Sequence, residues 1–105
     1  MRTITIYPDY CSSGLWNEDG ANMCESAMEG IIPEELMMLL KYWHWTWEFF
    51  INDEDICENK SPKASHEAKM IWYNDGQKIV EAFNKCLTNV THKFVYGVPE
   101  IKEKA

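Results

Sequence analysis

The fold of this 105-residue chain is decided by residues 33–51, PEELMMLLKYWHWTWEFFI. Pro33 suits the first turn of a helix, and Glu34 and Glu35 place two negative charges at the positive end of the helix dipole. Apolar residues follow at helical spacing, so the stretch predicts a helix from Pro33 to about Ile51.

This helix carries two apolar stripes rather than one. At about 100° of rotation per residue, the first stripe contains Leu36, Leu39, Leu40, Trp43, Trp47 and Phe50. The second contains Met38, Tyr42, Trp45 and Phe49, and the residues Lys41, His44 and Glu48 mark a narrow polar strip between the two. A surface helix needs only one apolar face. The second stripe is therefore covered either by another part of this chain, or by another protein or a second copy.

Strand patterns lie at both ends of the chain. Residues 3–7 alternate polar and apolar side chains before Pro8, and residues 93–96 form a second β-rich run before Gly97. Between the first strand and the first helix lie residues 10–30, a polar stretch long enough to hold a further short strand.

A second long helix is predicted from Ser61 and Pro62, an N-cap followed by a first-turn proline, to about Thr88. Gly76 lies inside it and predicts a kink or a restart. The whole pattern predicts an α+β fold: one two-layer domain over residues 1–105, in the order strand, long loop, helix, helix, strand. Two long helices would pack on a small sheet with the terminal strands side by side.

The composition is acidic and narrows the class of partner. Ten Lys and Arg stand against 17 Asp and Glu, giving a net charge of -7. This balance disfavours binding to nucleic acid or to an anionic membrane and favours a basic protein. No signal peptide or transmembrane run is visible, so we expect a cytoplasmic protein with four reduced cysteines, Cys11, Cys24, Cys57 and Cys86.

Catalytic and metal-binding patterns are weak. The three histidines lie on different predicted elements, and no Cys or His pair has metal-ligand spacing. We therefore expect no cofactor and no metal. A small hydrolase or transferase that uses Cys11 or Asp9 stays open as a minor alternative to a non-enzymatic role.

The acids gather in two parts of the sequence. Residues 9–35 contain Asp9, Glu18, Asp19, Glu25, Glu29, Glu34 and Glu35, with no Lys or Arg among them, and residues 53–58 contain Asp53, Glu54, Asp55 and Glu58. If both segments lie at the same end of the domain, they form a strongly negative patch.

Three segments carry a resemblance to a known group of proteins. Residues 7–16, YPDYCSSGLW, resemble the opening strand and turn of a group of small bacterial proteins, while residues 33–36, PEEL, and 75–80, DGQKIV, sit where those proteins place their helices. At this size and charge the chain resembles the immunity proteins encoded beside polymorphic or contact-dependent growth-inhibition toxins.

The resemblance implies a steric and electrostatic mechanism. The acidic face would cover the active site of a basic toxin domain, commonly a nuclease. The expected contact residues are Asp9, Glu18, Asp19, Asp53, Glu54 and Asp55, with Trp16 as an aromatic anchor and Tyr42 and Trp45 as further anchors. The alternative is a homo-oligomeric structural or regulatory module, a homodimer built on the second stripe of the first helix.

Overall fold

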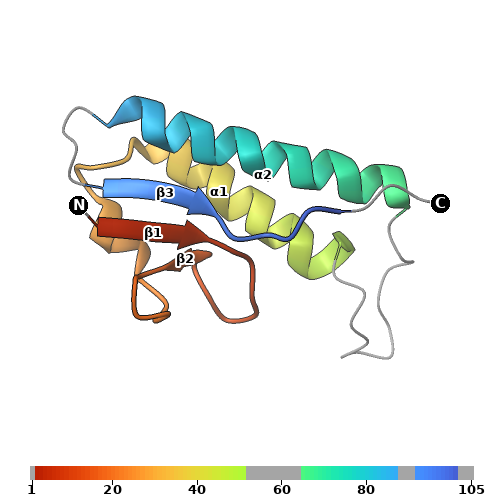
Figure 1. Cartoon of the computed structure of the whole chain (residues 1–105), viewed down its shortest axis with the longest axis horizontal. Helices are drawn as coiled ribbons and strands as arrows, with labels where there is room; N and C mark the ends of the chain where they lie inside the picture. The colour runs from red at the N-terminus through yellow and green to blue at the C-terminus, as the bar shows by residue number, and fades with distance from the viewer. Residues whose placement is uncertain (1, 52–64, 88–91, 102–105) are drawn as a thin grey trace.

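The computed structural model describes residues 2–51, 65–87 and 92–101 (Figure 1). Its strands are β1 (Arg2–Ile6), β2 (Leu15–Trp16) and β3 (His92–Tyr96). Its helices are the 3-10 turn η1 (Glu25–Met28), α1 (Glu34–Thr46), the π-helical turn η2 (Trp47–Ile51) and α2 (His66–Cys86).

The three strands form one mixed sheet in the order β2-β1-β3. β1 pairs in parallel with β3, with Ile4 opposite Phe94, and antiparallel with β2, with Ile6 opposite Leu15. The terminal strands are therefore neighbours, as predicted, and the long loop does supply a short third strand. The parallel pair is possible because both helices lie between β1 and β3 in the sequence.

Both helices cover one face of the sheet, which makes the two layers of the predicted α+β domain (Figure 1). The strands turn Ile4, Ile6 and Phe94 toward the helices, where all three are buried. Phe94 meets Phe83 of α2 edge to face, with ring centroids 5.1 Å apart. This alternation of buried and accessible residues is what a sheet with one packed face requires.

A pair of tryptophans joins the two helices. The rings of Trp43 in α1 and Trp72 in α2 stack with centroids 4.6 Å apart and planes 2° apart. Each indole donates to the backbone of the other: Trp43 Nε1 lies 2.9 Å from the Trp72 carbonyl, and Trp72 Nε1 lies 3.1 Å from the Trp43 carbonyl. Buried indole N–H groups need such partners, so this clasp fixes where the helices cross.

The predicted kink at Gly76 is wrong, because α2 runs without a break through this position. A Cβ at Gly76 would overlap the hydroxyl of Tyr96 and would lie 2.7 Å from Cζ2 of Trp43. The glycine thus lets α1 and β3 approach α2 closely. The predicted N-cap Ser61 lies outside the described residues; α2 begins after Ser65, whose side chain accepts from the Ala68 N–H, and ends two residues before Thr88.

Candidate protein-binding site

The second stripe of the first helix is exposed to solvent. We define its members as the ridge: Met38, Tyr42, Trp45 and Phe49, which are between 46 % and 69 % exposed. The ring of Trp45 contacts those of Tyr42 and Phe49, with centroids 5.8 and 5.0 Å apart. No described part of the chain covers this stripe. It is therefore a surface of large, exposed apolar side chains.

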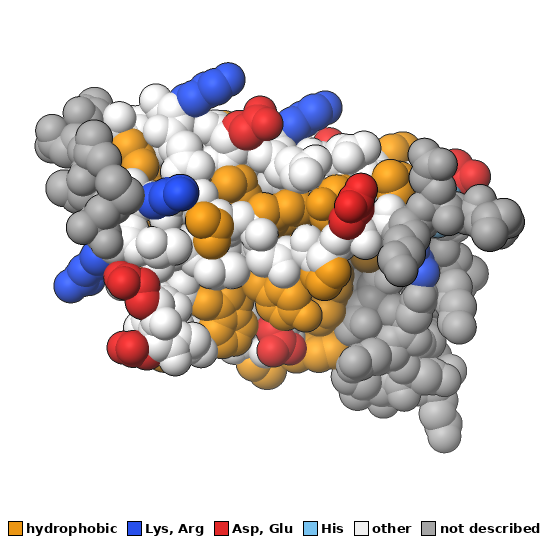
Figure 2. Space-filling model, in the orientation of Figure 1, with side chains coloured by type: hydrophobic (Ala, Val, Ile, Leu, Met, Phe, Trp, Pro, Cys, Tyr) orange, Lys and Arg blue, Asp and Glu red, His pale blue; other side chains and the backbone are white. Residues whose placement is uncertain are grey.

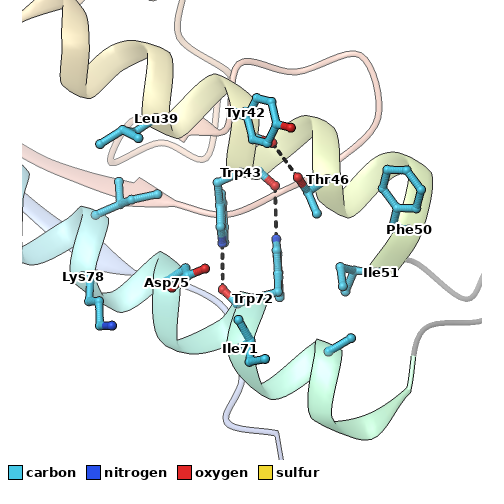
Figure 3. Close-up of a pocket in the computed structure, with 12 residues that line it drawn as sticks. Leu39, Tyr42, Trp43, Thr46, Phe50, Ile51, Ile71, Trp72, Asp75 and Lys78 are labelled. Atoms are coloured by element: carbon cyan, nitrogen blue, oxygen red, sulfur yellow. Dashed lines mark hydrogen bonds between the residues drawn. The ribbon is translucent and has the colours of Figure 1, made fainter.

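Beside the ridge, a groove of about 550 Å³ runs between α1–η2 and α2 (Figure 3). The stacked Trp43 and Trp72 lie in its middle. Its lining residues are Leu39, Tyr42, Trp43, Thr46, Phe50, Ile51, Ala68, Ile71, Trp72, Asp75, Lys78 and Ile79. The groove is thus about three helical turns long, since residues 39–51 span roughly 18 Å at 1.5 Å per residue.

The groove offers apolar contact with few polar groups. Ile71 on the α2 rim is 63 % exposed, and Leu39 and Phe50 on the opposite rim are about half exposed. Thr46 Oγ1 already donates to the Tyr42 carbonyl at 2.9 Å. Such contiguous exposed apolar surface is uncommon on soluble monomers and marks interaction sites.

The acidic residues predicted to bind the partner do not form one patch within the described residues. Glu18 and Asp19 lie near the start of β1, where Glu18 Oε1 accepts from the Thr3 N–H at 3.4 Å. Asp9 follows the other end of β1, so it is separated from them by a strand of about 13 Å at 3.3 Å per residue. Figure 2 accordingly shows Asp and Glu as small separate groups on the face it presents.

The expected contact residues of the second acidic segment, Asp53, Glu54 and Asp55, lie outside the described residues. All the described acids of residues 9–35 are exposed, so they contribute to the charge around the molecule. The expectation of a single negative face therefore stays a prediction.

Trp16, the expected aromatic anchor for a partner, makes a hydrogen bond within the fold. It belongs to β2 and is half-buried, and its Nε1 donates to the Tyr7 carbonyl at 2.8 Å. This bond ties β2 to the end of β1. Tyr42 and Trp45, by contrast, lie together on the exposed ridge.

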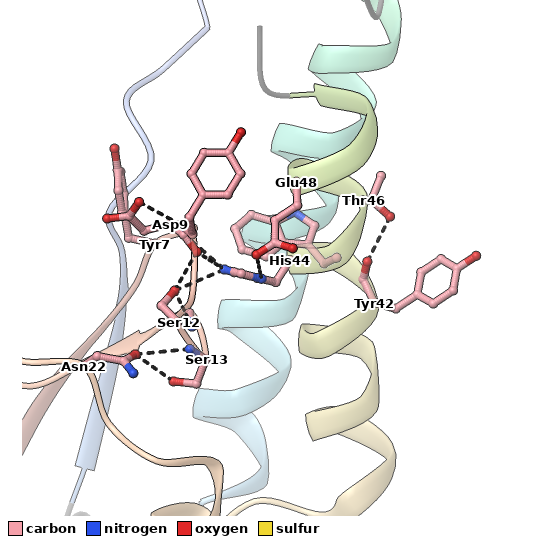
Figure 4. Close-up of polar contacts among 12 residues, drawn as sticks. Tyr7, Asp9, Ser12, Ser13, Asn22, Tyr42, His44, Thr46 and Glu48 are labelled. Carbon is pink, nitrogen blue, oxygen red and sulfur yellow. Dashed lines mark hydrogen bonds and ion pairs between the residues drawn. The ribbon is translucent and has the colours of Figure 1, made fainter. Parts of the chain in front are cut away.

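His44 was expected on a polar surface strip, and this expectation is wrong. Its side chain is only 7 % exposed and faces the loop after β1 (Figure 4). Nε2 lies 2.8 Å from the Asp9 carbonyl and 3.1 Å from Ser12 Oγ, while Nδ1 lies 3.7 Å from Glu48 Oε1. The Asp9 N–H also points to Nε2, at 3.3 Å. His44 therefore anchors the loop to α1.

Ser12, His44 and Glu48 contact one another in the sequence hydroxyl, imidazole, carboxylate, as in a hydrolase triad. Their hydrogen bonds, however, are made to the backbone of the loop. The Ser12 hydroxyl donates to the Asp9 carbonyl at 2.9 Å, and the imidazole faces the same carbonyl. A nucleophile needs its hydroxyl proton directed to the base and its oxygen open to substrate. We assign this cluster to holding the loop.

Two cysteines of the loop region are exposed. Cys11 is exposed, with a φ of 55°. Hydrogen bonds from the hydroxyl and the backbone of Ser26 to Cys24 lower the pKa of the Cys24 thiol. The nearby negative charges of Glu25 and Glu29 raise this pKa by a smaller amount. Among the described residues, no three His, Cys, Asp or Glu side chains are grouped so as to hold a metal ion.

Sequence comparison gave no independent indication of function. No protein-family model matches the chain, and no curated protein matches it. Within the described part of the chain, no helix combines the length and apolar character needed to cross a membrane.

The sequence analysis missed the second wall of the groove. Ile71 and Ala68 line it, yet neither was counted as core or surface contact. The signal was present: in α2 Ile71 directly precedes the buried Trp72 and lies four residues before Asp75. An Ile on the polar side of an amphipathic helix is the pattern of a second, exposed contact face.

Proposed function

We propose that this chain is a cytoplasmic, non-catalytic protein-binding domain that neutralises a basic toxin domain. The observation that carries the proposal is the apolar groove between α1 and α2, with the ridge beside it. Apolar and aromatic side chains at the centre of an interface provide most of its binding energy, and Trp and Tyr are enriched there.

The charge of the molecule supports a basic partner. The chain carries -7 overall, and most of its described acids are exposed, on several elements. Such a field speeds the approach of a positively charged protein without requiring one continuous negative patch. The apolar groove would then supply affinity, and the acids would supply rate and selectivity.

The expected contribution of one groove residue can be worked out. Full burial of an Ile side chain is worth about 1.5–3 kcal/mol. Because Ile71 is 63 % exposed in the free chain, a partner that covers it gains about 1–2 kcal/mol. Ile71→Ser should therefore weaken binding roughly tenfold, since 1.4 kcal/mol corresponds to a factor of ten.

The direct experiment co-expresses this chain with the product of the gene immediately upstream of its own, which the proposal requires to be a toxin. We expect restored growth of the toxin-expressing cells and a 1:1 complex whose affinity falls as NaCl is raised. Ile71→Ser should reduce protection. Tyr7→Ser, which removes an exposed large side chain outside the groove, on the loop after β1, is the matched control and should protect fully. Failure of the wild-type chain to bind or protect would refute the proposal.

A further inference from the structure

Beyond the proposed function, we infer that two copies of the free chain pair through the ridge, with their α1 helices antiparallel about a two-fold axis. The ridge points away from the core, since the opposite side of α1 presents Leu40 and Trp43, which are buried. A surface that pairs with its own copy must be self-complementary.

The spacing of the ridge residues meets this condition. Their separations along the sequence are four, three and four, which is the repeat of an apolar seam between two helices. This order is the same in both directions. A two-fold axis between Tyr42 and Trp45 therefore places each Tyr42 against Trp45 of the other copy and each Met38 against Phe49 of the other copy.

The exposed area of the ridge suits a weak, transient pair. The four ridge residues together expose the equivalent of a little over two whole side chains. At about 200 Å² per large apolar side chain this is roughly 450 Å² per copy. The pair would bury about 900 Å², in the range of weak, transient interfaces below about 1,200 Å². The ring contacts of Trp45 with Tyr42 and Phe49 already order the surface before pairing.

Charge acts against pairing and gives it a distinctive salt dependence. Each copy carries -7, so the two copies repel one another at low ionic strength. Raising NaCl from about 0.05 M to about 0.5 M shortens the Debye length from roughly 14 Å to roughly 4 Å. Pairing should therefore strengthen with salt, whereas binding to a basic toxin should weaken.

Sedimentation equilibrium of the purified chain tests the pairing. In about 0.5 M NaCl, the mass should rise with protein concentration from the 12.3 kDa of one chain toward twice that value. Trp45→Ser should stay monomeric, while Tyr7→Ser and the groove variant Ile71→Ser should still pair. A wild-type monomer at hundreds of micromolar would overturn the inference. It would leave the toxin-binding proposal standing, because Ile71→Ser tests that proposal separately.

Cross-linking tests the antiparallel register. In a chain whose four native cysteines are replaced by Ser, Met38→Cys with Phe49→Cys should form a covalent dimer on oxidation. Met38→Cys alone should not, because the two copies of position 38 would lie about 16 Å apart along the helices, beyond the roughly 7 Å that a disulfide allows. A strong dimer from Met38→Cys alone would contradict the antiparallel arrangement.

Discussion

Replacing Gly76 by Ala should destabilise the protein, although helix propensity alone predicts the opposite. In a solvent-exposed helix this change gains about 1 kcal/mol. Here the added Cβ would overlap the Tyr96 hydroxyl and lie 2.7 Å from Trp43 Cζ2. Overpacking of this kind costs about 1–3 kcal/mol. Displacing the Tyr96 hydroxyl also breaks its 2.9 Å bond to the Tyr73 carbonyl, worth about 1 kcal/mol.

The net expectation for Gly76→Ala is a loss of about 2 kcal/mol, or a fall in Tm of roughly 8–16 °C for a domain of this size. Urea unfolding followed by circular dichroism measures the free energy of unfolding. Asn74→Ala, at an exposed position of the same helix, is the control and should stabilise by about 0.5 kcal/mol. Adding Tyr96→Phe to Gly76→Ala should cost less than the two single changes together, because it removes the nearest clashing atom. A stabilised Gly76→Ala would refute the close approach of α1, α2 and β3.

Three further predictions concern titration and the loop anchor. The lowered pKa of the Cys24 thiol should keep this thiol reactive toward iodoacetamide at lower pH than an ordinary cysteine, and Ser26→Ala should shift its pH–rate profile upward. Burial raises the pKa of the Tyr96 hydroxyl above its ordinary value of 10.0, so the folded state holds this proton longer than the unfolded state. Stability should therefore fall as the pH rises above about 10, and Tyr96→Phe should flatten that part of the pH profile. His44→Ala removes the Nε2–H that faces the Asp9 carbonyl at 2.8 Å, which should cost about 1 kcal/mol, loosen the loop and speed amide exchange at Asp9; unchanged exchange there would contradict the anchoring role.

The elements of the fold were predictable because each has a local signal. Alternation marked β1, a β-rich run before Gly97 marked β3, and the proline with two glutamates marked the start of α1. The register of the strands has no such local signal. The parallel pairing of β1 with β3 depends on how the two helices that connect them pack on the sheet.

Gly76 and His44 show why some positions could not be predicted. Helix propensity treats Gly as a weak point of a helix. At position 76, however, Trp43 and Tyr96 pack so close to the backbone that a larger residue would clash with them. Spacing placed His44 on a polar strip, but its hydrogen bonds go to a loop 35 residues earlier in the sequence. Tertiary contacts decide both residues, and periodicity carries no information about them.

The candidate site was likewise predictable only in part. The two stripes of the first helix were visible in the sequence, and the ridge is indeed a separate face from the core. The groove was not visible, because it exists only where α1 and α2 meet. The predicted acidic face depends on how distant segments gather: Glu18 and Asp19 lie near the start of β1, whereas Asp9 follows its other end.

Calorimetric titration tests most directly whether the groove binds the partner, when the toxin domain that this chain neutralises on co-expression is titrated into the chain. Wild type and Tyr7→Ser should bind with equal affinity, and Ile71→Ser should bind roughly tenfold more weakly. Equal affinities for all three proteins would show that the toxin docks elsewhere.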